Sequence, residues 1–159
     1  MAEPFPKTIH SALLGTLTLE EFHSSVNVNR HYGPAGPITV AQRSGVRLVI
    51  WPPKHGLTDV AKFVSYIERT LEGLNSSFER ILVEAEPHVA ERIESWWWPD
   101  APPGDAHAVL QSGKLFLVCI NADGLHEVML SDTTDIVSKR DVRIYLGAKL
   151  QPVRAGLDG

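Results

Sequence analysis

The fold is decided by residues 57–98, which read LTDVAKFVSYIERTLEGLNSSFERILVEAEPHVAERIESWWW. Apolar residues first recur here at spacings of three and four, which is typical of one face of an amphipathic helix: Leu57, Val60, Val64, Ile67, Leu71 and Leu74. A second stripe of the same period follows: Phe78, Ile81, Leu82, Ala85, Val89 and Ile93. Ser76 and Glu79 fit a capping box at the start of this second stripe. The pattern therefore predicts two helices within about residues 57–98.

Pro87 interrupts the second stripe, because proline lacks the backbone N–H that a helix interior uses. One interpretation is a kinked helix that continues to Trp98. The alternative is a buried strand over Arg80–Glu86, with Pro87 at the first position of a new helix. We favour the kinked helix, because the apolar stripe keeps its helical phase across Pro87.

The residues on both sides of this segment alternate between apolar and polar side chains, as strands do. Val26–Tyr32 alternates regularly, and Ile38–Gln42 with Val46–Trp51 predicts a hairpin. Four more strands are predicted after the helices: His107–Gln111, Lys114–Ile120, Leu125–Leu130 and Val142–Leu146. The first two of these are expected to form a hairpin. We predict an α+β fold in which an antiparallel sheet of about seven or eight strands carries the two helices on one face.

Length and composition are those of one small globular domain. The chain has 159 residues, 43% hydrophobic and 21% charged, and we assign residues 1–159 to a single domain. Its net charge is −4 at pH 7 and it has no Lys/Arg cluster, so we expect no nucleic-acid binding. It also has no apolar stretch as long as a membrane span and no signal-peptide core. We expect a cytoplasmic protein, most simply a bacterial one.

No catalytic or metal-binding motif is recognisable in the sequence. The single cysteine, Cys119, lies in an apolar run, where a thiol behaves as a small buried hydrophobe. Glu84, His88 and Glu91 share one side of a predicted helix, but their order is not that of di-metal helix bundles. A solvated helix face explains these three residues. We therefore expect no metal, no cofactor and no enzymatic activity.

Three consecutive tryptophans, Trp96, Trp97 and Trp98, precede Pro99. Consecutive helical residues point about 100° apart, so three neighbours cannot share one buried face. Trp96 falls on the apolar stripe, whereas Trp97 and Trp98 do not. We predict that Trp97 and Trp98 bind a protein partner, because aromatic side chains at interfaces carry much of the binding energy. In the alternative, the helix frays before Pro99 and all three rings pack beneath the connector that follows.

The polar loop after residue 130 is the second predicted contact region. Its charged residues are Asp132, Asp135, Lys139, Arg140 and Asp141. Their spacing is not that of a calcium loop, which needs alternating oxygen ligands, a glycine and a late glutamate. We assign Asp132, Asp135, Arg140 and Asp141 to the predicted partner-binding surface. A solvated loop is the alternative.

The stretch from His126 to Tyr145 resembles small bacterial domains of unknown function. In those domains a strand leads to an acidic turn, an aromatic-Gly-His signature and an alternating strand. Asp132 and Asp135 match the acidic turn, and Val142–Tyr145 matches the second strand. Val137–Lys139 stands where the signature would be. The resemblance lies in the C-terminal third, and it implies a binding role of the kind that candidate immunity proteins have.

These features lead to one main hypothesis and two alternatives. The main hypothesis is a non-enzymatic cytosolic interaction module of the immunity type, which binds a toxin or another protein. The first alternative is a small-ligand-binding or enzymatic domain with a pocket between sheet and helices, using His107, Cys119 or Glu84. The second alternative is a structural subunit that forms a homo-oligomer through the tryptophan end of the helix.

Overall fold

The structure, a computed structural model, describes residues 5–96, 105–134, 136–137 and 140–158. This part of the chain contains nine strands and two helices: β1 Thr8–Ser11, β2 Gly15–His23, β3 Val28–Gly33, β4 Ile38–Val40, β5 Arg43–Trp51, α1 Val60–Trp96, α2 Asp105–Ser112, β6 Lys114–Asn121, β7 His126–Ser131, β8 Asp141–Leu146 and β9 Pro152–Asp158. All nine strands form one sheet in the order β1-β2-β3-β5-β6-β7-β8-β9, with β4 paired to β5. The predicted α+β class with a mostly antiparallel sheet is confirmed.

Two antiparallel meanders meet at the centre of this sheet. Strands β1 to β5 form the first meander and strands β6 to β9 form the second. The central pair, β5 and β6, is parallel, with Val49 opposite Cys119. A parallel pair needs a crossover connection, and α1 with α2 supplies it. The sheet is therefore two meanders joined by one helical crossover.

Helix α2 replaces the strand that was predicted at His107–Gln111. Its buried residues are Ala106, Val109 and Leu110, which are spaced by three and one as on one helix face. Asp105 lies in the first turn, where a carboxylate interacts favourably with the helix dipole. The predicted hairpin of this segment with Lys114–Ile120 is therefore wrong, and β6 pairs with β5 instead.

Helix α1 is a single helix where two were predicted. Asp59 caps its start, because Asp59 Oδ1 accepts the N–H of Lys62 at 3.0 Å. Ser76 does not cap a second helix; its hydroxyl instead donates to the carbonyl oxygen of Gly73 at 3.3 Å. The buried apolar stripe continues on both sides of Ser76, and burial of that stripe outweighs the capping preference of one serine.

Pro87 lies inside α1, so the helical interpretation of Arg80–Glu86 is correct and the strand alternative is wrong. Proline cannot donate a hydrogen bond to the carbonyl group four residues earlier, which is that of Val83. Pro87 and Val83 are both exposed, so water can bond the carbonyl that proline leaves unpaired. The helix therefore tolerates this proline because it lies on the solvent side.

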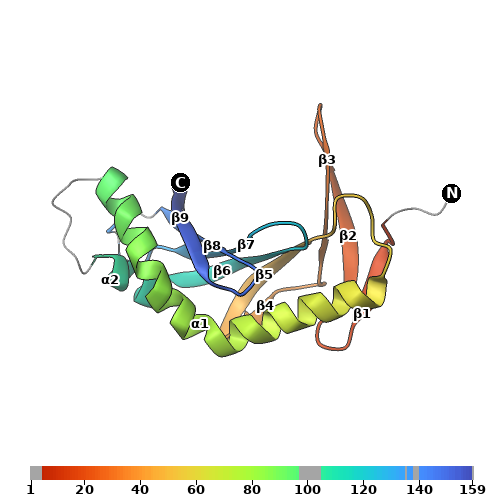
Figure 1. The fold of residues 1–159 in the computed structure, drawn as a ribbon, viewed down its shortest axis with the longest axis horizontal. Coiled ribbons are helices and arrows are strands. Elements are labelled where there is room, and N and C mark those ends of the chain that lie inside the picture. The colour runs from red at the N-terminus through yellow and green to blue at the C-terminus, as the bar shows by residue number, and fades with distance from the viewer. Residues whose placement is uncertain (1–4, 97–104, 135, 138–139, 159) are drawn as a thin grey trace.

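Helix α1 runs along one face of the sheet from β1 to β9 (Figure 1). The buried side chains that it contributes to the core are Phe63, Ile67, Leu71, Leu74, Phe78, Ile81, Leu82, Ala85, Val89 and Ile93. The predicted stripe contained all of these except Phe63. The sheet contributes the side chains on its helix-facing side, including Tyr32, Ile50 and Val118. Val49 and Cys119 are also buried, but they point to the opposite side of the sheet and lie outside this core.

Helix α1 is bent near its middle (Figure 1), where Gly73, Asn75, Ser76 and Ser77 are all weak helix formers. The turn between β8 and β9 packs against this part of the helix. A Cβ atom at position 73 would lie only 2.7 Å from Leu150 Cδ1. Leu150 is buried, so its side chain would have to shift within the core to admit a Cβ atom at position 73. Glycine at this position therefore lets the turn pack closely against the helix.

A buried hydrogen-bond network ties α1 to β7 and its preceding turn. The Tyr66 hydroxyl donates to the carbonyl oxygen of Asn121 at 3.1 Å and lies 3.1 Å from His126 Nε2. His126 Nδ1 accepts the N–H of Asn121 at 3.0 Å. This pattern assigns the proton of a neutral imidazole to Nε2, which donates to Tyr66. Burial lowers the pKa of His126, whose exposed fraction is 1%.

We expect Gly73→Ala to lower the free energy of unfolding by about 1 kcal/mol. Overpacking costs about 1–3 kcal/mol, whereas the gain in helix propensity is only about 1 kcal/mol. In a Leu150→Ala background the same change is expected to raise the free energy of unfolding by about 1 kcal/mol. Urea denaturation of the four proteins measures this coupling. Equal effects of Gly73→Ala in both backgrounds would mean that Leu150 is not the reason for the glycine.

We expect the free energy of unfolding to fall as the pH drops below about 6.5, the ordinary pKa of histidine. The unfolded chain then binds a proton at His126, whereas the folded chain keeps this imidazole neutral because its pKa is lowered. The stabilising effect is thus present above the unfolded pKa and is lost as the pH falls towards the folded pKa. The slope of the unfolding free energy against pH reports the number of protons taken up on unfolding. His126→Gln is expected to reduce this number by up to about one. Urea unfolding of both proteins at several pH values tests this, and equal slopes would contradict it.

Candidate functional site

Half of the residues predicted to bind a partner lie outside the described part of the chain. These are Trp97, Trp98 and Asp135, and nothing is described of the Trp96 side chain either. Their predicted roles therefore stay predictions.

The other three predicted residues lie together where β7 leads to β8. Asp132 is buried, and its carboxylate accepts the backbone N–H groups of Thr134 and Val137 at 2.8 and 3.0 Å. The N–H of Arg140 donates to the carbonyl oxygen of Val137 at 3.1 Å. Asp141 begins β8 and is half-buried. These bonds give Asp132 a structural role inside the loop, and its predicted partner-binding role stays untested.

The residues of the alternative pocket do not come together. Glu84 forms an ion pair with Arg80 at 2.6 Å on the surface of α1. His107 of α2 pairs with Glu86 at 2.6 Å. Cys119 lies on the sheet face away from α1, and burial raises the pKa of its thiol to about 12. A thiol with this pKa is protonated at neutral pH and is a poor nucleophile, so this set offers no common catalytic site.

The outer half of the β2–β3 hairpin is the most prominent feature outside the core. It rises away from α1 as a two-stranded ribbon (Figure 1). β1 pairs with β2 no further than Thr18, and β5 pairs with β3 only at Tyr32. Every residue from Glu20 to Asn29 is consequently exposed. We call residues 20–31 the ribbon.

The ribbon carries three exposed apolar side chains near its end. Phe22 is 52% exposed, Val26 is 82% exposed and Val28 is 41% exposed. A two-stranded hairpin is only marginally stable in water without a further strand or helix against it. Apolar side chains gathered on such an unsupported element are typical of a surface that contacts another molecule.

One face of the ribbon holds an aromatic cluster of Phe22, His31 and Trp51. The Phe22 ring stacks on His31 at 5.2 Å between centroids, and Trp51 meets His31 at 5.4 Å in an edge arrangement. His31 is buried, and its Nε2 lies 3.1 Å from Glu20 Oε2. Its Nδ1 is buried without a hydrogen-bond partner among the described residues. A hollow of about 340 Å³ lies beside His31, bounded mainly by the Gly33–Pro37 loop.

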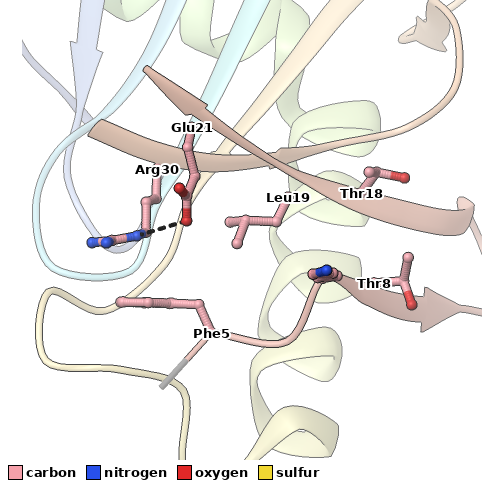
Figure 2. Close-up of a pocket in the computed structure, with 7 residues that line it drawn as sticks. Phe5, Thr8, Thr18, Leu19, Glu21 and Arg30 are labelled. Carbon is pink, nitrogen blue, oxygen red and sulfur yellow. Dashed lines mark hydrogen bonds and ion pairs between the residues drawn. The ribbon is translucent and has the colours of Figure 1, made fainter. Parts of the chain in front are cut away.

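The opposite face of the ribbon holds a charged pair above an aromatic ring. Figure 2 shows Arg30 and Glu21 pointing toward each other, with Arg30 Nε 3.1 Å from Glu21 Oε1. The Arg30 guanidinium also lies 5.2 Å from the centre of the Phe5 ring. The surrounding hollow has a volume of about 600 Å³ and includes Leu19 and Thr18. Phe5 therefore supports the base of the ribbon from this side.

Both carboxylates of the ribbon have a hydrogen-bonding partner across the β2–β3 pair. Glu20 faces His31, and Glu21 faces Arg30, both across the β2–β3 pair. Exposed pairs of this kind add little stability on their own. They do reduce the number of unpaired charges that a partner would have to desolvate when it covers the ribbon.

The alternation of Val26–Tyr32 predicts a strand, but it does not predict that the outer part of this strand lacks a neighbour on one side. The structure closes a tight turn with the N–H of Ser24 donating to the carbonyl oxygen of Asn27 at 2.8 Å. Turns of this kind favour Gly, Asn, Asp and Ser. A valine at position 26 is therefore unusual, and it was the sequence feature that could have indicated an apolar side chain exposed at the turn. Phe22 beside two glutamates was a second such feature. Neither face of that strand segment is purely apolar, which indicates that neither face packs against the core.

Comparisons with protein-family models, with curated proteins and with solved structures find no match to this chain. Among the described residues, no three His, Cys, Asp or Glu side chains lie close enough together to hold a metal ion. Neither helix in this part of the chain has the length and apolarity that crossing a membrane requires. The functional interpretation therefore depends on the geometry of the ribbon and its surroundings.

We expect His31→Phe to leave the free energy of unfolding unchanged or to raise it by about 1 kcal/mol. The substitution keeps a ring between Phe22 and Trp51 and removes the buried Nδ1 that has no partner. It also removes the Nε2 contact with Glu20, whose exposed carboxylate can bond to water instead. His31→Ala, the control, removes the ring and is expected to lower the free energy of unfolding. Urea denaturation distinguishes the two. A loss for His31→Phe as large as that for His31→Ala would mean that an imidazole nitrogen makes a stabilising hydrogen bond.

Proposed function

We propose that this domain is a non-enzymatic module that binds another protein through the ribbon. The observation that carries the proposal is the exposure of Phe22, Val26 and Val28 on an element that α1 does not support. Burying an apolar side chain of this size contributes about 1.5–3 kcal/mol. Contact with a partner would therefore stabilise both the complex and the ribbon itself.

The shape of the ribbon favours a protein over a small molecule as the main partner. Small ligands bind in concave sites that bury most of their surface. The exposed apolar side chains instead belong to a hairpin that projects from the sheet (Figure 1), and a projecting hairpin is suited to a groove of a larger molecule. The Glu21–Arg30 ion pair also supports this proposal, because neither of these two charges would be left unpaired when a partner covers the ribbon.

In its more specific form the proposal is an immunity-type role in the cytoplasm of a bacterium. The ribbon would enter a groove of a toxin and block it. Two considerations support this form: a projecting hairpin is suited to occluding a cleft, and the C-terminal third resembles domains that are candidate immunity proteins. Trp97, Trp98 and the loop around Asp132 would form a second contact. A homo-oligomer is the alternative if the groove belongs to a second copy.

The combined change Phe22→Ser with Val26→Ser tests the proposal. We expect it to weaken binding of the partner by about 30-fold or more, because two exposed anchors are lost. The melting temperature is expected to fall only modestly, since Phe22 and Val26 are 52% and 82% exposed and the stack of Phe22 on His31 is the packing contact that is lost. The partner is identified by affinity capture from the source cells and then purified, so that Kd can be measured by calorimetry.

Val83→Ser provides the matched control. Val83 is 57% exposed, but it lies on α1, away from the ribbon. We expect the Val83→Ser protein to bind the partner as tightly as the parent protein does. Equal affinity of the Phe22→Ser/Val26→Ser protein and the Val83→Ser protein would rule out the ribbon as the binding surface.

A further inference from the structure

The sheet splits on one side of the ribbon, and this split creates a cleft along β3. β3 and β5 pair only at Tyr32 and Ile50. Further along, β5 gives way to Pro52 and Pro53, which have no N–H groups to donate to a neighbouring strand. The chain diverges there, and a cleft of about 420 Å³ lies between the outer part of β3 and the connectors that follow β5 and β6.

The backbone groups of β3 that face this cleft follow from the register of the hairpin. The Ser24–Asn27 hydrogen bond marks a bonded pair at the turn, and bonded and non-bonded pairs alternate from there. Asn29 and His31 therefore bond to β2, whereas Val28 and Arg30 direct their N–H and C=O groups outward. On the other strand, the outward N–H of Leu19 donates to the carbonyl oxygen of Lys7, as this alternation requires.

The outward groups of Val28 and Arg30 have no main-chain partner in the part of the chain that the structure describes. The edge of β9, at the far end of the sheet, does have a hydrogen-bonding partner. There α1 packs against β9, and Arg92 Nε donates to the carbonyl oxygen of Ala155 at 2.8 Å. Proteins usually protect their strand edges in this way, because an open edge pairs readily with other chains. The β3 edge is thus an unprotected edge beside a cleft.

The walls of the cleft combine apolar and basic groups. Val28 and the half-buried Trp51 supply apolar surface. Lys54 supplies positive charge, and its ammonium has no ion-pair partner among the described residues, whereas the charge of Arg30 is already paired with Glu21. Asp123 is the acidic residue of the cleft, and its carboxylate already accepts the N–H of Lys54 at 2.7 Å. An occupant with an acidic side chain would therefore complement this cleft.

We infer that the cleft takes an extended segment of the protein partner, which adds to the sheet as a strand along β3. This inference rests on the proposed function and specifies how the partner binds. The segment would exchange main-chain hydrogen bonds with Val28 and Arg30, as in β-strand addition. It would place an apolar side chain against Trp51 and an acidic side chain near Lys54.

Proline substitutions at the two edges of the ribbon test the strand pairing. Val28→Pro removes an N–H that faces the cleft but spares the hydrogen bonds between β2 and β3. His23→Pro is the matched control, because His23 is paired opposite Val28 and its N–H points to the other edge. Val28→Ala removes the side chain and keeps the N–H. Circular dichroism verifies that all three proteins are folded.

The probe is a linear peptide selected against the full chain from a displayed library of random linear peptides and then synthesised. We expect Val28→Pro to weaken its binding by about tenfold or more, and His23→Pro and Val28→Ala to change it by less than about threefold. Enrichment of no peptide, or equal losses for Val28→Pro and His23→Pro, would overturn the inference. Equal losses for Val28→Pro and Val28→Ala would also overturn it, because the side chain would then be the contact.

Amide hydrogen exchange of the parent protein gives an independent result that needs no substitution. We expect the Arg30 amide to become protected when the selected peptide binds, because its N–H then donates to the peptide. An Arg30 amide that exchanges equally fast with and without peptide would overturn the inference. The proposed function can stand without it: loss of partner binding in the Phe22→Ser/Val26→Ser protein alone would keep the ribbon as the binding surface and discard strand pairing.

Discussion

Coverage of the sheet by one long helix is the constraint on which the rest of the structure depends. A helix of 37 residues is about 55 Å long, and eight neighbouring strands span about 34 Å. Helix α1 can therefore reach from β1 to β9 without help from a second helix. It is only about 10 Å wide, however, so it covers a band across the strands and not their full length. The outer half of β2 and β3 lies beyond this band, and the sheet face opposite α1 lacks a helix among the described residues.

The exposed elements follow from this incomplete coverage. Pro52 and Pro53 end the pairing of β5 with β3, so the ribbon loses its neighbour at the point where α1 no longer supports it. The protein protects other vulnerable parts. Arg92 bonds a carbonyl group on the β9 edge, and Glu68 of α1 accepts hydrogen bonds from Ser11 and Leu13 at the β1–β2 turn. Three exposed apolar side chains and an open strand edge thus occur together on the ribbon, whereas Val83 and Val153 are exposed on other elements. That combination supports a binding role for the ribbon.

The sequence predicted those parts of the fold that local periodicity controls. The apolar stripe of α1 and the alternating strands were readable, because burial acts on each element separately. The continuity of α1 through Pro87 was also readable, because the apolar stripe keeps its helical phase there. The continuity through Ser76 was not, since the local capping signal of Ser76 is outweighed by the continuous core. The parallel β5–β6 pair was also missed, because strand pairing is not a local property. For the site, Trp97 and Trp98 stay predictions. The ribbon was not predicted, because its exposure depends on where α1 and β5 stop supporting β3.

The most direct test of this account is residue-by-residue amide hydrogen exchange of the free protein. Outward amides of the ribbon, those of Val28 and Arg30, are expected to exchange at rates close to those of an unfolded chain. Amides in the central strands, such as that of Val118, are expected to exchange only through global unfolding. Protection of Val28 and Arg30 equal to that of Val118 would contradict the account, because the ribbon would then already be supported in the absence of a partner.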